Sequence, residues 1–420
     1  MKSSYALLSE KRILKLLSKI YTSPGVFLET SYLDRNNHKS LLFSSPKRIL
    51  TFNLGGSLNN FFKEAEDSLS AGLWLAGYFT YEFGYLFEPK LKKLLSKKRI
   101  SFPLSWIGIF PPPKIISHKD DTLPVLGKPA QLSSYRIKGG RLNTRLGEYR
   151  EAIGKIKTHL LRGDTYQVNY TLKYKGIFSG DIKSFYLQMR RKQPTSFSGV
   201  VNDGKRMILS LSPELFFRVN KRRIVTKPMK GTYPRGRTFH QDRENKEFLP
   251  RDLKNRAENI MIVDLLRNDL GKIACKGSVK VPRCFNVEEY PSLFQMTSTV
   301  KAKLKKNEKL GDLFKALFPS GSVTGAPKIR TMQIINRLEK EPRDVYTGSV
   351  GFVSPSGESC FNVAIRTVIV DKNRVECGLG GGIIYDSSPL KEYEEVLLKS
   401  QFLREEAVEK TTAPDYSDLG

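Results

Sequence analysis

The chain has 420 residues, of which 39% are hydrophobic and 10% aromatic, and this composition is typical of a folded protein of roughly two or three domains. No run of about 18 uncharged apolar residues occurs, which excludes a membrane-spanning helix, and the opening residues lack the apolar core of a signal peptide. Four cysteines without a Cys-x-x-Cys pair are too few for a disulfide framework. We therefore expect a cytoplasmic protein that makes no contact with a membrane.

The formal net charge of +29 is the unusual feature of the composition. An excess of this size is typical of proteins that bind nucleic acid or anionic membranes. The basic clusters are short and lie far apart in the sequence, at 90–99, 221–223 and 301–309, and no zinc-finger spacing or aromatic RNA-binding signature accompanies them. We favour a solvated basic surface over a role in binding nucleic acid.

Residues 1–125 are predicted to form an N-terminal region that mixes short strands with one helix. Consecutive prolines within 110–114 stop a strand or helix from continuing, so the strand-rich part should end there and the polar residues 115–143 should form a connector. Aromatic and β-branched residues predict strands at 25–30, 40–45 and 73–87, and helical spacing of apolar residues predicts a helix at 57–72.

Residues 140–408 are predicted to form the second region. It opens with an amphipathic helix at 146–164, which Gly163 closes. Strands and helices then mix without the alternation of a βαβ fold, which favours an α+β fold with a largely antiparallel sheet. The polar segment 409–420 is predicted to be a disordered tail.

Several common catalytic motifs are missing from the sequence. None of the four histidines lies in a metal-ligand spacing. The sequence contains no Gly-x-Ser-x-Gly or Gly-x-Cys-x-Gly nucleophile elbow, no phosphate-binding Gly-x-x-x-x-Gly-Lys-Ser/Thr loop and no dinucleotide fingerprint. If the protein is an enzyme, its acid–base chemistry must therefore come from glutamate, aspartate and lysine.

Glu214 is a candidate general acid. It stands at the start of a predicted strand over 211–219, beside Leu215 and two phenylalanines. Apolar surroundings raise the pKa of a carboxyl group and let it donate a proton near neutral pH. The alternative interpretation is a solvated glutamate at a strand end.

Lys230 lies in a segment, 226–237, in which four cationic residues alternate with prolines and glycines. This pattern predicts a shaped loop rather than a regular face. Three interpretations of this loop are open. It could bind an anion, it could hold Lys230 as a neutral nucleophile, or it could be a plain basic surface loop.

Two further segments are weaker candidates. Glu258 lies in the first turn of a predicted helix over 256–272, where a glutamate either binds a metal or only interacts with the helix dipole. In 319–339, glycines and small residues precede a helix that opens at Ala326-Pro327, and its N-terminal amides favour an anion. A purely structural glycine turn is the alternative for this second segment.

The segment 377–399 is the most specific of the candidates. Four glycines within five positions precede a helix on which Glu392, Glu395 and Lys399 share one face. Two carboxylates beside a glycine-rich loop favour a hard cation such as Mg²⁺, and the glycine amides with Lys399 favour a ligand carboxylate. A solvated Glu/Lys helix face is the alternative.

Taken in order, these segments resemble the chorismate-utilising enzymes, the family of the large components of anthranilate synthase and aminodeoxychorismate synthase. The resemblance covers about residues 145–405, with weaker echoes before them. It implies an α+β enzyme with two stacked, largely antiparallel sheets flanked by helices, and a site in a cleft of the C-terminal part. The motifs are GDTYQVNYT (163–171), SPEL (212–215), PMKGTYPR (228–235), RAENIMIVDLLRNDLG (256–271), PSGSVTGAPKIRTM (319–332), YTGSVGF (346–352), FNVAIRT (361–367) and GLGGGIIYDSSPLKEYEE (378–395).

The resemblance also implies roles for individual residues. Glu258 and Glu395 correspond to Mg²⁺ ligands, with Glu392 as a nearby second carboxylate. Glu214 corresponds to the general acid that helps to expel the C4 hydroxyl of chorismate. The implied contacts with the substrate are made by Tyr346, Arg366, Gly380, Gly381, Lys399 and Thr324.

Two positions favour one branch of the family. Isochorismate and salicylate synthases carry a water-activating lysine where this chain has Gln167, so ammonia fits better than water as the nucleophile. Anthranilate synthases typically carry alanine where this chain has Lys230, whereas aminodeoxychorismate synthases carry a lysine that is proposed to attack C2 of chorismate. That attack needs a neutral amine; Lys227 or Arg235 would lower the pKa of Lys230, and Glu214 would raise it.

The resemblance therefore implies the large component of an aminodeoxychorismate synthase, which converts chorismate and ammonia to 4-amino-4-deoxychorismate for 4-aminobenzoate and folate. A separate glutamine amidotransferase subunit would supply the ammonia. Gln295 replaces a histidine of many relatives and cannot relay a proton at neutral pH. The near alternative is anthranilate synthase, and the distant one is a basic nucleic-acid-binding protein on an inactive enzyme scaffold.

Overall fold

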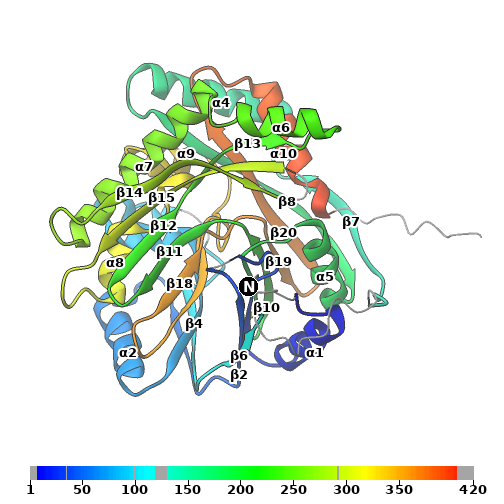
Figure 1. Ribbon diagram of the computed structural model, residues 1–420, viewed down its shortest axis with the longest axis vertical. Helices are drawn as coiled ribbons and strands as arrows, with labels where there is room; N and C mark the ends of the chain where they lie inside the picture. Colours follow the sequence, from blue (N-terminus) through cyan, green and yellow to red (C-terminus); the bar gives the residue numbers. More distant parts are fainter. Residues whose placement is uncertain (1–6, 35, 98–99, 119–129, 291–292, 404–420) are drawn as a thin grey trace, which may run out of the picture.

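The computed structural model describes residues 7–34, 36–97, 100–118, 130–290 and 293–403. Two ten-stranded sheets dominate the structure, and every strand pairing among these residues is antiparallel. Figure 1 shows the helices around the outside of the two sheets. The predicted α+β fold with two stacked antiparallel sheets is confirmed.

The first sheet, sheet A, contains the longest strands. Its strands follow the order β16 (Gly325–Ala326), β8 (Gln167–Gly180), β20 (Arg374–Ile383), β19 (Thr367–Asp371), β10 (Arg206–Ser212), β9 (Phe197–Asn202), β1 (Gly25–Glu29), β2 (Lys39–Ser44) and β6 (Lys114–Ser117), and β7 (Tyr135–Leu142) also pairs with β8.

The second sheet, sheet B, has the same number of strands. Their order is β13 (Met229–Pro234), β15 (Leu293–Lys303), β12 (Arg223–Lys227), β11 (Leu215–Asn220), β18 (Ser359–Asn362), β17 (Ser349–Val353), β4 (Trp74–Phe79), β5 (Ser105–Phe110) and β3 (Arg48–Phe52), and β14 (Lys280–Glu289) also pairs with β15.

Both predicted regions contribute strands to each sheet. In sheet A, β1 from the N-terminal region pairs with β9, and in sheet B, β4 pairs with β17. The ranges 1–125 and 140–408 therefore share both sheets and the core between them. The predicted tail at 409–420 lies outside the described residues.

The helices cover the outer faces and one end of the sheets. Helices α4, α6, α7, α9 and α10 gather at the top of Figure 1, α2 and α8 lie beside sheet B, and α1 and α5 lie beside sheet A. The helices are α1 (Glu10–Tyr21), α2 (Leu58–Ser70), α3 (Pro89–Lys92), α4 (Leu146–Leu161), α5 (Ile182–Lys192), α6 (Phe239–Phe248), α7 (Leu253–Ile273), α8 (Leu310–Leu317), α9 (Lys328–Leu338) and α10 (Pro389–Lys399), and the 3₁₀ helices are η1 (Tyr81–Phe87), η2 (Leu95–Lys97), η3 (Gly321–Val323) and η4 (Gln401–Leu403). Among the described residues, none of these helices is long and apolar enough to cross a membrane.

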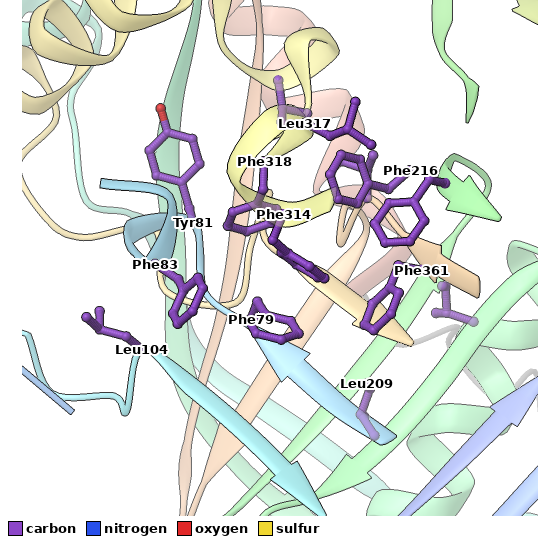
Figure 2. Close-up of a cluster of buried hydrophobic side chains, with 14 of the residues drawn as sticks. Phe79, Tyr81, Phe83, Leu104, Leu209, Phe216, Phe314, Leu317, Phe318 and Phe361 are labelled. Atoms are coloured by element: carbon purple, nitrogen blue, oxygen red, sulfur yellow. The ribbon is translucent and has the colours of Figure 1, made fainter. Parts of the chain in front are cut away.

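Side-chain alternation along the strands builds two core layers. Val201 and Ile208 of sheet A pack in one cluster with Tyr78 and Trp106 of sheet B, so the two sheets face each other through this layer. The opposite face of sheet B packs against α8 and the segment after it. Figure 2 shows the rings of this second layer, where the centroids of Phe79 and Phe314 lie 4.1 Å apart.

Local signals in the sequence set several helix boundaries as predicted. Helix α2 begins after Ser57, whose hydroxyl accepts a hydrogen bond from the Asn60 amide at 3.3 Å. Helix α4 ends before Gly163, which adopts a left-handed conformation with φ of 70°. The predicted helices at 57–72 and 146–164 are therefore confirmed within a few residues at each end.

Two predictions for the N-terminal region are wrong. The predicted strand over 73–87 ends at Phe79, because Glu82 turns back to accept the backbone amides of Arg343 and Asp344, and the chain continues as η1. The predicted connector contains the edge strands β6 and β7, whose polar side chains reflect their exposure at the sheet edges. The prolines form the turn between β5 and β6 rather than ending the region.

Candidate active site

Lys230 lies where the two sheets approach each other, on β13 of sheet B. A Cβ atom added to Gly382 of sheet A would lie 3.1 Å from Lys230 Nζ and 2.1 Å from Gln167 Nε2. The charges that act on Lys230 come from Glu258, Glu214, Lys399 and Glu395. The structure thus gathers predicted residues that lie up to 185 positions apart in the sequence.

Glu214 is buried directly before β11, with 3% of its surface exposed. Burial raises the pKa of its carboxyl group to about 7, against the opposing effects of a hydrogen bond with Ser322, the charge of Lys230 and the Met229 amide. Among the residues that the structure describes, its buried Oε1 atom has no hydrogen-bond partner. The sequence predicts a raised pKa for this carboxyl group, and its buried position in the structure agrees with that prediction.

Lys230 is partly buried, and burial lowers the pKa of its amine from the ordinary value. The carboxylates of Glu258, Glu214 and Glu395 oppose this shift, and the charge of Lys399 adds to it. The expected loop around Lys230 is instead the strand β13, with an irregular register against β15 between Met229 and Thr232. The amine is therefore held on a sheet rather than on a flexible loop.

The cations expected to lower the pKa of Lys230 are occupied elsewhere. Lys227 forms an ion pair with Glu288, and Arg235 contacts Asp242 at 2.6 Å. Lys399, on helix α10, takes their place beside Lys230. The sequence could not indicate this exchange because Lys399 is far from Lys230 along the chain.

Glu258 lies in the second turn of α7 and faces the end of β8. Its Oε2 atom accepts a hydrogen bond from Gln167 Nε2 at 3.1 Å. Gly382 provides the space for this contact, because a side chain there would overlap the carboxamide. Gln167, which the sequence marked only as the position of a lysine in relatives, is thus a direct partner of a predicted metal ligand.

The four glycines of 378–382 lie in strand β20 and not in the loop that the sequence predicts. Packing requires glycine at Gly378 and Gly380, since an added Cβ would lie 2.1 Å from the Tyr346 ring and 2.3 Å from the Tyr170 carbonyl, respectively. An added Cβ at Gly382 would lie 2.1 Å from Gln167 Nε2 and would force that carboxamide to move. Gly381 is different, because its nearest atoms would be Glu392 Oε2 at 3.4 Å and Lys399 Nζ at 3.9 Å.

Helix α10 presents the predicted face toward these glycines. Lys399 Nζ lies 2.7 Å from Glu395 Oε1 and donates to the Gly380 carbonyl at 2.9 Å. Glu392 accepts a hydrogen bond from Ser387 at 2.8 Å, and burial raises the pKa of its carboxyl group. The shared helix face predicted for Glu392, Glu395 and Lys399 is present in the structure.

Three other predicted substrate contacts lie on neighbouring segments. Tyr346 is buried with its ring against Gly378. Thr324 is fully buried, and its hydroxyl donates to the carbonyls of Ser320 and Gly321 at 3.2 Å. Arg366 is half-buried, its carbonyl accepts from the Leu211 amide at 3.1 Å, and burial lowers the pKa of its guanidinium group. Within the described part of the chain, none of these three side chains is among the charged groups that shift the pKa of Lys230.

Comparison with known proteins identifies the family of this site. A family model described as chorismate binding enzyme matches residues 35–405. The chain belongs to the chorismate-binding enzyme family. It is 35% identical over 338 residues to aminodeoxychorismate synthase component 1 of Salmonella typhimurium, covering 77% of this chain and 74% of that protein.

Two anthranilate synthases are also similar to this family member. It is 32% identical over 358 residues to anthranilate synthase component 1 of Saccharolobus solfataricus, covering 83% of this chain and 84% of that protein. The crystal structure of anthranilate synthase component I from Streptococcus pneumoniae shares its fold, with a TM-score of 0.75, 24% identity and coverage of 89% and 94% of the two chains. The predicted family and fold are therefore confirmed.

Glu258 and Glu395 of this chorismate-binding enzyme offer carboxylate oxygens, which are ligands that magnesium prefers. Magnesium is commonly held by one or two protein carboxylates together with water and substrate oxygens. The charges of both carboxylates raise the pKa of the Lys230 amine, so both act on the same part of the site. Within the described residues no group of three or more histidine, cysteine, aspartate or glutamate side chains is placed to hold a metal, so Glu392 does not complete a three-ligand cluster.

Sequence reasoning missed one residue that contacts Glu214. Ser322 forms a hydrogen bond with the Glu214 side chain. Ser322 belongs to the PSGSVTG motif, which the sequence analysis singled out. The contact itself could not be predicted, because Ser322 and Glu214 lie more than 100 positions apart in the sequence. Gln295 is buried, donates to the Gly231 carbonyl at 2.9 Å and accepts from Thr232 at 3.1 Å, which makes it a support for the backbone around Lys230.

Proposed function

We propose that this chain is the large component of an aminodeoxychorismate synthase, which converts chorismate and ammonia to 4-amino-4-deoxychorismate and water. The observation that carries this proposal is the pairing of a buried carboxyl group, Glu214, with an amine, Lys230, whose pKa values both shift toward neutrality. Burial thus favours the uncharged form of both groups, a carboxyl group that can donate a proton and an amine that can act as a nucleophile. The similarity to aminodeoxychorismate synthase component 1 of Salmonella typhimurium supports the same assignment.

Lys230 and Glu214 would act in the first half of the reaction. The neutral Lys230 amine forms a bond to C2 of chorismate while the bond from C4 to its hydroxyl breaks. Protonated Glu214 gives its proton to the departing hydroxyl, which leaves as water. The ring is then attached to Lys230 through C2, and Glu214 is a carboxylate.

Ammonia would complete the reaction at C4. It forms the C4–N bond while the bond between C2 and Lys230 breaks, which returns the amine of Lys230 and restores the ring double bonds. The Glu214 carboxylate takes one proton from the new ammonium group and returns to its starting state. Two displacements of this kind leave nitrogen at C4, the carbon that lost the hydroxyl.

Glu258 and Glu395 would hold a magnesium ion in this proposal, with Gln167 fixing the Glu258 carboxylate through its hydrogen bond. The ion would supply positive charge to a carboxylate of the bound substrate. Lys399 has two of its three N–H donors directed to Glu395 and Gly380, and the third would be free for a substrate oxygen. The remaining predicted contacts, from Tyr346, Arg366, Thr324 and Gly381, would complete the binding of the carboxylates.

Ammonia would come from a separate glutamine amidotransferase subunit. Several similar proteins are named component 1, which supports a partner subunit. Free ammonium salts at alkaline pH should replace the partner in an assay, because the deprotonated fraction is the nucleophile.

Anthranilate synthase is the second candidate, and the extensive similarity to the enzyme of Saccharolobus solfataricus favours it. Product identity separates the two. The purified chain should be incubated with chorismate, Mg²⁺ and ammonium, and the products should be separated by chromatography and identified by mass spectrometry. We expect 4-amino-4-deoxychorismate; anthranilate would refute the proposed regiochemistry, and the absence of any chorismate turnover with excess ammonia would refute the proposed activity.

A further inference from the structure

Arg343 lies at the junction of the segments that carry the predicted substrate contacts. It follows α9, and 2% of its side chain is exposed. Its guanidinium group stacks over the ring of Tyr81 at 4.3 Å, and Figure 2 shows Tyr81 at the border of the buried aromatic cluster. A buried cation in this place must be held by specific partners.

All five N–H groups of this guanidinium point to acceptors. Nε and one Nη2 hydrogen reach the carboxylate of Glu339, at 2.9 and 2.6 Å. The other Nη2 hydrogen reaches the Asn169 carbonyl at 2.6 Å, and Nη1 reaches the Val323 carbonyl at 2.8 Å and the Thr347 hydroxyl at 3.3 Å. Only arginine offers five donors in one rigid fork.

The two carbonyl acceptors belong to separate walls of the site. Asn169 lies on β8 two positions after Gln167, and its amide donates to the Thr324 carbonyl at 2.8 Å. Val323 lies between Ser322, which bonds to Glu214, and Thr324. Arg343 therefore bridges β8 and the segment that contains Thr324, in addition to the direct backbone pairing between them.

The same cation also anchors the segment that carries Tyr346. Its own amide donates to Glu82 at 2.7 Å, and the Thr347 hydroxyl that it contacts donates to the Tyr346 carbonyl at 2.6 Å. Glu339 links the assembly to β8 a second time, because it accepts the amide and the hydroxyl of Thr171 at 2.9 and 3.0 Å.

We propose that Arg343 is a positioning residue for chorismate: it sets the distance between the wall at Asn169, the wall at Val323 and Thr324, and the Tyr346 segment, without touching the substrate. This inference rests on the proposed chorismate site. It makes the geometry of the guanidinium, and not its charge alone, a determinant of substrate affinity. Lys230 lies on sheet B, outside this assembly, so the loss should fall on binding more than on turnover.

The substitution Arg343→Lys tests this directly, because it keeps the charge and removes the fork. A lysine has three donors and cannot reach both walls, so KM and Kd for chorismate should each rise by about tenfold while kcat falls less than threefold. Arg190→Lys is the matched control, since Arg190 pairs with Glu29 at 2.7 Å in another buried arginine–glutamate contact, away from the site. Its KM should stay within about twofold of the parent value.

Chorismate binding by fluorescence or calorimetry gives Kd without reference to the product. Thr347→Val is a milder second variant, to be used if Arg343→Lys does not fold. It removes one hydrogen-bond acceptor of the guanidinium and should raise the Kd for chorismate by about threefold. An unchanged Kd in the folded variants would overturn the positioning role while leaving the proposed reaction intact. Failure of the parent chain to bind chorismate would overturn both the positioning role and the proposed reaction. An equal loss of chorismate affinity in Arg190→Lys would show that the effect is general destabilisation, which would also overturn the positioning role.

Discussion

The buried carboxyl group of Glu214 should make the chain less stable as the pH rises. Its pKa is about 7 in the folded chain against an ordinary value of 4.5. The folded chain therefore binds this proton more tightly than the unfolded chain, so the free energy of unfolding falls as pH rises between these two values. At 1.36 kcal/mol per pKa unit, this single group should remove about 3 kcal/mol of stability by pH 8.

The substitution Glu214→Gln removes the titration and keeps the shape of the side chain. Urea unfolding of both proteins at several pH values between 4.5 and 8 gives the difference between their free energies of unfolding. The contributions of the other titrating groups are the same in both proteins and cancel in this difference. The variant should gain about 3 kcal/mol relative to the parent across this range while losing activity. Glu394→Gln, at an exposed position of α10, is the control and should show no such trend. A difference that stays constant with pH would refute a buried, protonated Glu214.

Three further predictions concern the reactive amine, the metal and the glycine strand. Lys230→Ala should reduce C4 amination by at least about a hundredfold, measured as the rate of product formation, because the covalent step is lost; unchanged kinetics and product would remove Lys230 from the mechanism. Glu395→Gln should raise the Mg²⁺ concentration needed for half-maximal activity and weaken Mg²⁺ binding in calorimetry, whereas full activity at low Mg²⁺ would argue against a ligand role. Gly382→Ala should impair turnover, because its methyl group would displace Gln167 and press on Lys230. Gly381→Ala should fold normally, because its methyl group meets no atom closer than 3.4 Å. Equal behaviour of the two variants would contradict these packing contacts.

The sequence predicted the fold class and several elements where local signals were strong. The helical spacing of apolar residues in 57–72 acts within a few positions, and α2 forms there. The strand predicted over 211–219 is divided in the structure between the end of β10 and the start of β11. The edge strands β6 and β7 were missed for a physical reason. Their residues contact solvent, so polar composition made them indistinguishable from a connector.

The candidate site shows the same division between local and distant effects. Residue types and order were sufficient to select Glu214 and Lys230, whose surroundings the structure now describes. The identity of the cation beside Lys230 was predicted incorrectly, because it depends on how β13 meets α10. The glycines of β20 were taken for a loop, since extended backbone with no side chain to pack has no distinctive local pattern.

The arrangement of Glu214 and Lys230 differs from an ordinary buried pair of opposite charges. Within the described residues no ion pair joins them, although each acts on the pKa of the other. Burial favours the neutral form of both groups, which is the form that the proposed chemistry needs, and a direct ion pair would favour the charged forms instead. The absence of a direct ion pair is therefore consistent with the proposed chemistry.

The two sheets divide the work of this site. Glu214 lies directly before β11 and Lys230 lies on β13, so both belong to the sheet B side of the site. Sheet A contributes β8, whose Asn169 carbonyl accepts from Arg343, and β20, whose glycines pack closely against their neighbours. A change at Asn169 should therefore act on the sheet A side alone, whereas a change at Val323 also reaches Glu214 through the neighbouring Ser322.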